Sequence, residues 1–138
     1  MIGILLLTHG TLGESLIQTA IHVLNRRPSR LRQIGMTAQD DPLLLLPQAR
    51  ALVKEIDQGD GVLILADMYG GSPSNVAAKL IVPGKVEAVA GVNLPMLIRA
   101  LTYREKSLDV MITKAISGGC EGVMRVPLLT LHHAATGS

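Results

Sequence analysis

The sequence predicts an α/β protein with a doubly wound, mostly parallel sheet of five strands in the order 2-1-3-4-5. Short aliphatic runs alternate with amphipathic helical patterns along the chain, as is typical of stacked βα units. The apolar residues are Leu, Ile, Val, Ala and Met, with no Phe and no Trp. This composition suits buried parallel strands covered by helices. At 138 residues, we expect one domain over residues 1–138.

Periodicity and helix-capping patterns place each element along the chain. The expected elements are a strand over 2–7, a helix from about 13 to Asn25, a strand over 31–36, a helix ending at Ile56, a strand over 61–67, a helix from Pro73 with Ser72 as its cap, a strand over 85–93, short helices over 94–101 and 108–116, and a last strand over 122–131.

Two prolines complicate this assignment. Pro42 could start the second helix, but Pro47 would then remove an interior hydrogen bond at a cost of about 3 kcal/mol. That helix therefore either starts near Leu44 or kinks. Pro127 cannot donate to a ladder of strand hydrogen bonds, so we expect the last strand at an edge of the sheet or with a bulge.

Bulk properties exclude several classes of protein. The net charge is only +2 and the aromatic residues are two tyrosines, whereas a nucleic-acid interface favours a basic face interleaved with aromatics. Cys120 is the single cysteine, which predicts no disulfide and a reducing compartment. No apolar run reaches the ~18 residues of a membrane span, so we expect a cytoplasmic protein without membrane insertion.

Polar side chains follow three of the expected strands, where function collects in open α/β sheets. His9 ends the first strand, Asp67 ends the third, and Asn93 ends the fourth. In the order 2-1-3-4-5 the first and third strands are neighbours, so His9 and Asp67 should meet. A carboxylate that accepts a hydrogen bond from one ring nitrogen fixes the tautomer and makes the other nitrogen the better nucleophile.

The segment YGGSPSN suits an anion. Gly70 and Gly71 allow close approach of backbone N–H groups, Ser72 adds a hydroxyl, and a helix N-terminus follows. A tautomer-fixed histidine beside an anion cradle predicts transfer of a phosphoryl group. The chain has no GxxxxGK[ST] motif, so a phosphoprotein is a better donor than a nucleotide. We predict no metal and no organic cofactor.

Each of these residues also has an ordinary structural interpretation. A histidine or an aspartate at a strand end is often only solvent-facing or a turn cap, and Gly70-Gly71 could be a plain tight turn. Only their convergence on one sheet edge favours a site. Met68, Tyr69, Asn93 and Pro95 are then expected to form its rim.

Three motifs, THG, LADMYGGSPSNVA and AGVNLPML, resemble the mannose-class IIA (EIIA) domain of the bacterial phosphoenolpyruvate-dependent sugar phosphotransferase system (PTS). The resemblance covers nearly the whole chain. It implies that His9 is the phosphorylation site, that Asp67 hydrogen-bonds it, and that Ser72 helps to hold the phosphoryl group. It also implies a homodimer whose antiparallel last strand is exchanged between subunits.

The resemblance implies a phosphotransferase that takes its phosphoryl group from the histidine phosphocarrier protein HPr and passes it to an EIIB domain or uses it as a regulatory signal. Many relatives carry Trp where Tyr69 stands. The alternatives are the phosphotransfer subunit of a dihydroxyacetone kinase system, a regulatory binding module for a target protein, and a flavodoxin-like domain that binds a small ligand. Sugar specificity stays open.

Overall fold

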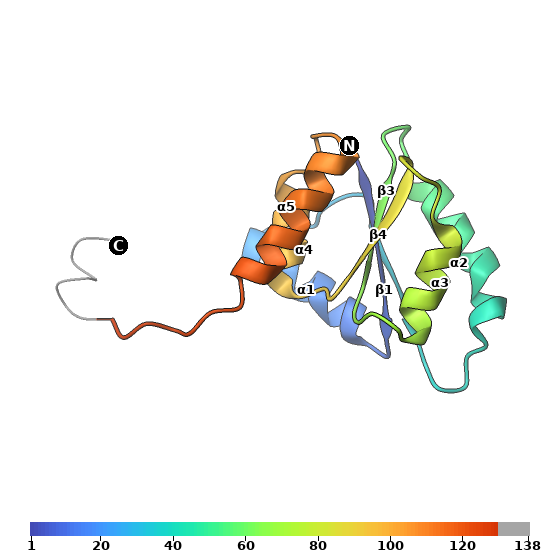
Figure 1. Cartoon of the computed structure of the whole chain (residues 1–138), viewed down its shortest axis with the longest axis horizontal. Coiled ribbons are helices and arrows are strands. Elements are labelled where there is room, and N and C mark those ends of the chain that lie inside the picture. Colours follow the sequence, from blue (N-terminus) through green and yellow to red (C-terminus); the bar gives the residue numbers. More distant parts are fainter. Residues whose placement is uncertain (130–138) are drawn as a thin grey trace.

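The computed structural model describes residues 1–129. A parallel sheet lies between two layers of helices (Figure 1). The elements in chain order are β1 (Gly3–His9), α1 (Leu12–Leu24), β2 (Leu31–Met36), α2 (Pro42–Ile56), β3 (Val62–Ala66), α3 (Ser72–Leu80), β4 (Val86–Ala90), α4 (Leu94–Thr102) and α5 (Leu108–Glu121). The strand order among these residues is β2-β1-β3-β4, and all strand pairs are parallel.

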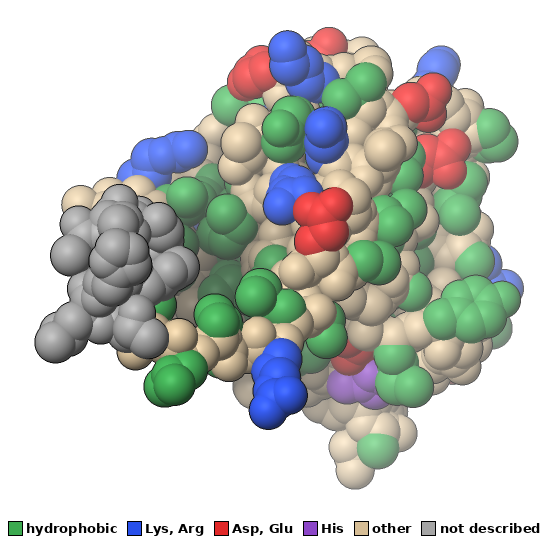
Figure 2. Space-filling model, turned by 60° about the vertical axis from the view of Figure 1, so that its left-hand side comes forward, with side chains coloured by type: hydrophobic (Ala, Val, Ile, Leu, Met, Phe, Trp, Pro, Cys, Tyr) green, Lys and Arg blue, Asp and Glu red, His purple; other side chains and the backbone are tan. Residues whose placement is uncertain are grey.

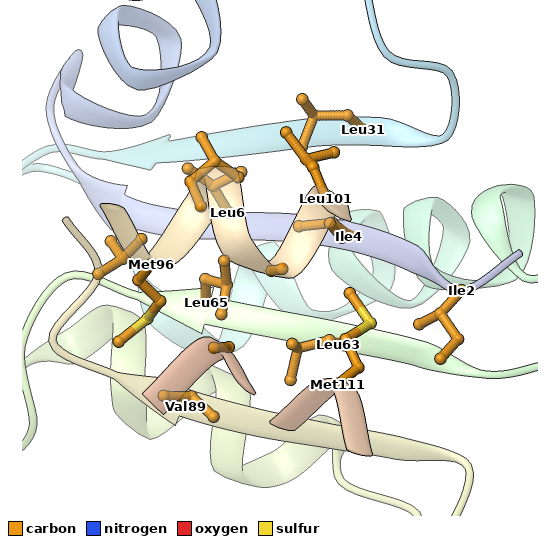
Figure 3. Close-up of a cluster of buried hydrophobic side chains, with 14 of the residues drawn as sticks. Ile2, Ile4, Leu6, Leu31, Leu63, Leu65, Val89, Met96, Leu101 and Met111 are labelled. Carbon is orange, nitrogen blue, oxygen red and sulfur yellow. The ribbon is translucent and has the colours of Figure 1, made fainter. Parts of the chain in front are cut away.

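The central strands are buried on both faces, which explains their continuous aliphatic runs. In β1, Ile4 and Leu6 belong to the core beneath α1, α4 and α5, whereas Leu5 and Leu7 belong to the core beneath α2 and α3. Figure 3 shows the first of these clusters, where Leu6 and Leu65 from neighbouring strands lie close to Met96 of α4. The predicted parallel architecture, with helices on both faces of the sheet, is therefore confirmed for the first four strands.

The second helix starts at Pro42, so the alternative start near Leu44 is wrong. Proline at the first helical position costs no hydrogen bond, and the Asp41 carboxylate caps the helix by accepting a hydrogen bond from the Leu43 N–H at 2.9 Å. The helix contains Pro47 and runs to Ile56 as predicted.

The predicted short helix over 108–116 is wrong in its end, because α5 continues to Glu121. Two glycines in the additional residues, Gly118 and Gly119, are contact points between helices. A Cβ on Gly118 would lie 2.8 Å from the Arg99 Cβ, and one on Gly119 would lie 2.8 Å from the Met96 Cε. These glycines allow α5 to pack closely against α4.

The predicted antiparallel last strand is absent from the described residues. Residues 123–129 form no strand and extend away from α5 (Figure 1), and the remainder of the predicted strand lies outside the described residues. Val126 and Leu128 are 86% and 90% exposed. Among residues 1–129 the sheet has four strands and ends at β4, because residues 123–129 lead away from it and do not pair with its edge.

Candidate functional site

The tip of β1 is anchored against the tip of β2. His9 aligns with Met36, and the Gly10 N–H donates a hydrogen bond to the Met36 carbonyl at 2.8 Å. This close approach requires a glycine at position 35, because a Cβ there would collide with the Gly10 carbonyl oxygen. The backbone that carries His9 is thereby fixed on one side.

A buried threonine fixes the start of the following helix. Thr8 has no exposed surface, and its Oγ1 accepts a hydrogen bond from the Gly13 N–H at 2.8 Å. The N-cap residue Thr11 makes no side-chain capping bond. Thr8, a residue of β1, therefore provides the hydrogen-bond acceptor for one of the N–H groups in the first turn of α1 that have no partner within the helix.

Asp67 meets His9 as the predicted strand order requires. Leu7 of β1 aligns with Ala66 of β3, so the next residues of the two strands are neighbours. The Asp67 Oδ2 accepts a hydrogen bond from the His9 backbone N–H at 2.8 Å and lies 2.8 Å from the His9 Nδ1. The Asp67 Oδ1 accepts a hydrogen bond from the Met68 N–H at 3.0 Å.

These contacts determine the charge of Asp67. Burial by itself raises the pKa of this carboxyl, but the hydrogen bonds from the backbone and ring of His9, with a smaller contribution from Met68, outweigh it, so the pKa of Asp67 lies below its usual range. An ionised carboxylate only accepts hydrogen bonds. The proton of a neutral His9 ring therefore lies on Nδ1, and Nε2 keeps a free lone pair.

Gly71 lies against the other side of the ring. A Cβ at this position would be 2.9 Å from the His9 Cε1 and 3.4 Å from the Nε2. The N-cap of α3 is Gly71 and not the predicted Ser72, which is an exposed residue in the first turn. The predicted Ser72 cap is therefore wrong, because the helix begins one residue earlier than expected.

Ser74, which the sequence analysis did not single out, organises the preceding turn. Its Oγ accepts a hydrogen bond from the Gly70 N–H at 2.9 Å and donates one to the Gly71 carbonyl at 3.0 Å. The Gly70 amide, predicted to bind a phosphoryl group, is thus engaged within the protein. A polar residue three positions after a helix N-cap often reaches back to the backbone, and that spacing was the available signal for Ser74.

The site lies at the surface. The His9 side chain is 51% exposed, whereas that of Asp67 is only 10% exposed. Met68 and Tyr69 are 56% and 89% exposed. A second protein can therefore reach the His9 ring, while its acidic partner is sheltered.

Asn93 and Pro95, both predicted for the rim, contact α5. The Asn93 Oδ1 accepts a hydrogen bond from the Met96 N–H at 2.9 Å, and its Nδ2 donates one to the Gly119 carbonyl at 3.1 Å. Pro95 lies against Gly122 at the end of α5. These contacts give both residues a structural role between α4 and α5.

Residues 1–129 contain no cluster of three or more His, Cys, Asp or Glu side chains that could hold a metal ion. Within the same residues, no helix is both long enough and apolar enough to cross a membrane.

The fold and site define a parallel α/β protein that presents a carboxylate-bound histidine at the carboxyl ends of its strands. Residues 3–116 match the family model described as "PTS system fructose IIA component". The chain belongs to this family, named EIIA-man. The resemblance predicted from the sequence is therefore confirmed.

Curated relatives support this assignment. The mannose-specific EIIAB component of Escherichia coli K12 is 33% identical over 137 residues, which cover 97% of this chain and 42% of that protein. The fructose-specific EIIA component of Bacillus subtilis is 43% identical over 54 residues, covering 38% of this chain and 37% of that protein. This chain thus spans less than half the length of the curated relatives it matches.

Solved structures show the same fold. The mannose/sorbose-specific IIA subunit from Enterococcus faecalis superposes with a TM-score of 0.82 at 26% identity, covering 94% of this chain and 98% of that one. The phosphotransferase component EIIA from Streptococcus agalactiae has a TM-score of 0.80 at 23% identity, covering 91% and 97%.

Proposed function

We propose that this protein is a phosphoryl carrier that accepts a phosphoryl group on His9 from phosphorylated HPr in the cytoplasm. The observation that supports this most strongly is the pair of contacts from the backbone and ring of His9 to one Asp67 oxygen. Those contacts leave Nε2 as the free nucleophile on a half-exposed ring. Family membership supplies the phosphotransfer context.

The transfer needs positioning and charge stabilisation more than covalent help from the protein. The His9 Nε2 lone pair forms a bond to phosphorus, the P–N bond to the donor histidine breaks, and its electron pair returns to the donor ring. The His9 ring then carries a positive charge while its Nδ1–H still donates to Asp67. The ionised carboxylate stabilises that charge at a distance of 2.8 Å.

The phosphoryl oxygens need donors near Nε2. In the described residues the Gly71 and Ser72 amides make no hydrogen bond, and they lie at the N-terminus of α3, where a partial positive charge favours anions. The exposed Ser72 hydroxyl is a third donor. We assign the phosphoryl-binding role to these groups, since the Gly70 amide is bonded to Ser74.

Incubation with phosphoenolpyruvate, enzyme I and HPr tests this proposal. The intact mass should rise by one phosphoryl group, which acid should remove, because phosphohistidine is acid-labile. His9→Gln should show no gain, whereas His22→Gln, which changes an exposed histidine of α1, should gain mass normally. Phosphorylation that persists in His9→Gln would overturn the assignment.

We further propose an EIIB domain as the acceptor, because the E. coli relative is an EIIAB component. Addition of EIIB to the isolated phosphoprotein should return the mass to that of the unmodified chain. Retention of the phosphoryl group would favour a regulatory signal instead. We also propose a homodimer, supported by the apolar segment 123–129 and by the outer edge of β4, which among residues 1–129 is paired only at Val86, with Val82.

A further inference from the structure

The hydroxyl of Ser74 closes the turn that precedes α3. It bridges two backbone groups, with the Gly70 N–H as donor at 2.9 Å and the Gly71 carbonyl as acceptor at 3.0 Å. The Gly71 carbonyl also accepts a hydrogen bond from the Asn75 N–H at 3.0 Å. Both ends of the Gly70–Gly71 turn are therefore tied to the first turn of the helix.

This turn touches the proposed nucleophile. The hypothetical Cβ of Gly71 lies 2.9 Å from the His9 Cε1, the ring carbon between the two nitrogens. Asp67 holds the ring through Nδ1 at 2.8 Å. The hydrogen bond at Nδ1 orients the imidazole, and the ring has its room beside Cε1 and Nε2 only because position 71 carries no side chain, so the surroundings of Nε2 depend on where Gly71 lies.

The same hydroxyl decides which amides remain available to an anion. The Gly70 N–H donates to Ser74, whereas the Gly71 and Ser72 amides make no bond among residues 1–129. Without the Ser74 hydroxyl, the Gly70 amide would be released and the turn would lose its closing contact. The set of free backbone amides and the position of Gly71 beside the His9 ring would then change together.

We propose that Ser74 is a positioning residue for phosphoryl transfer, acting through the Gly70–Gly71 turn on the His9 ring and on the amide donors beside it. This inference rests on the proposed function of His9. It assigns to Ser74 a role beyond capping α3, because the turn that it closes contacts the reacting ring.

The test compares Ser74→Ala with Ser74→Thr, which keeps the hydroxyl. The kcat for phosphorylation by phospho-HPr should fall about tenfold in Ser74→Ala, since a misplacement on the order of 1 Å can cost up to 10²-fold. The KM for phospho-HPr should change little, because the exposed rim residues Met68 and Tyr69 are retained. The phosphohistidine should hydrolyse several-fold faster, and Ser74→Thr should restore both values.

Ser107→Ala is the matched control. Ser107 caps α5 by accepting a hydrogen bond from the Val110 N–H at 3.3 Å. Its hydroxyl therefore acts on α5 and not on α3. Its loss should lower stability without changing kcat or the phosphohistidine lifetime. If Ser74→Ala does not fold, Ser74→Cys keeps a similar volume while weakening both hydrogen bonds.

Two results would overturn the role of Ser74. One is a wild-type kcat and phosphohistidine lifetime in Ser74→Ala, and the other is an equal loss in Ser107→Ala. Failure of the proposed function is distinguishable, because the wild-type protein would then gain no phosphoryl group or His9→Gln would still gain one.

Discussion

A single carboxylate oxygen receives both the backbone N–H and the ring of His9, so the charge of Asp67 couples the site to pH. The pKa of Asp67 is lowered in the fold, despite burial that by itself raises it. A lowered folded-state pKa contributes stability that is present above the unfolded value and lost as pH falls through the folded value. The stabilisation should therefore start to decline as the pH falls below about 4, the unfolded value, and be lost only once the pH is below the folded-state pKa.

Asp67→Asn tests this linkage. The wild-type protein should have the larger free energy of unfolding near pH 7, and the gap should shrink as the pH falls below about 4. Urea denaturation of both proteins from pH 7 to pH 3 measures it. A gap that is independent of pH would contradict the proposed ionised partner.

The second residue-scale prediction concerns Gly71. In Gly71→Ala the new methyl group would meet the His9 Cε1 at 2.9 Å, a distance that forces the ring or the turn to move. We expect phosphorylation of His9 to slow by about tenfold or more, measured as the rate of mass gain with phospho-HPr. Gly119→Ala is the control, since its methyl group would meet the Met96 Cε at 2.8 Å on α4, and it should react at the wild-type rate.

At the residue scale, the sequence predicted the pairing of His9 with Asp67 but not the role of Ser74. Strand order alone brings the first two together; the alternation of strands and helices predicts the parallel sheet, and the order 2-1-3-4-5 is a common one for such sheets. Ser74 acts through a turn whose backbone conformation, with Gly70 at φ +88°, becomes visible only in three dimensions.

At the scale of elements, the contact between β1 and α1 is the clearest case of a polar group that must be satisfied. Thr8 is fully buried and accepts the Gly13 N–H. Thr8→Val keeps the shape but leaves that N–H without an acceptor, which should cost about 1–3 kcal/mol of unfolding free energy. Chemical denaturation measures the loss.

Thr19→Val provides the control on the same helix. The Thr19 hydroxyl bonds only to the Ser15 carbonyl on the exposed face of α1, so its removal should change stability by no more than about 0.5 kcal/mol. Equal losses in the two variants would show that the Thr8 contact adds nothing to the stability of this junction.

An element could be predicted from the sequence where its own residues determine it, and not where packing against another element does. The strands β1 and β3 came directly from aliphatic runs, because both of their faces are buried. The end of α5 was placed too early, because the helix continues past 116 through Gly118 and Gly119, which make room for Arg99 and Met96 of α4. Close packing between helices is a tertiary property that the periodicity of one helix does not reveal.

At the scale of the molecule, Arg104 joins three segments at the amino ends of the strands. Arg104 is only 6% exposed, and its guanidinium donates hydrogen bonds to the carbonyls of Ile2, Ser29 and Arg30 at 2.7 to 3.1 Å. Arg104→Leu would remove all four of these hydrogen bonds, although the Arg30 carbonyl would still accept one from the Ile4 N–H. Stability should therefore fall by about 3 kcal/mol.

Phosphorylation of folded Arg104→Leu should be normal, because His9 lies at the opposite, carboxyl end of β1. Arg99→Leu is the control, since the 3.0 Å ion pair of Arg99 with Glu121 is partly exposed and should contribute about 1 kcal/mol or less. Denaturation and mass gain, measured on the same samples, separate stability from activity.

The segment 123–129 and the edge of β4 carry the last prediction. Its most exposed apolar side chains are Val126 and Leu128, at 86% and 90%. Figure 2 shows hydrophobic side chains gathered beside this segment, and a groove of about 730 Å³ runs along α4, lined by residues that include Leu94 and Ile98. Exposed apolar side chains gathered in this way are typical of an interaction surface.

A second copy of the chain would cover this segment by pairing it with the outer edge of β4, which among residues 1–129 is bridged only at Val86. Sedimentation equilibrium should then give twice the 14.6 kDa of one chain. Leu128→Lys should weaken the dimer, whereas Leu44→Lys, which changes a 76% exposed leucine of α2, should not. A monomeric wild-type protein, or equal association of the two variants, would exclude strand exchange as the reason that this apolar segment is exposed.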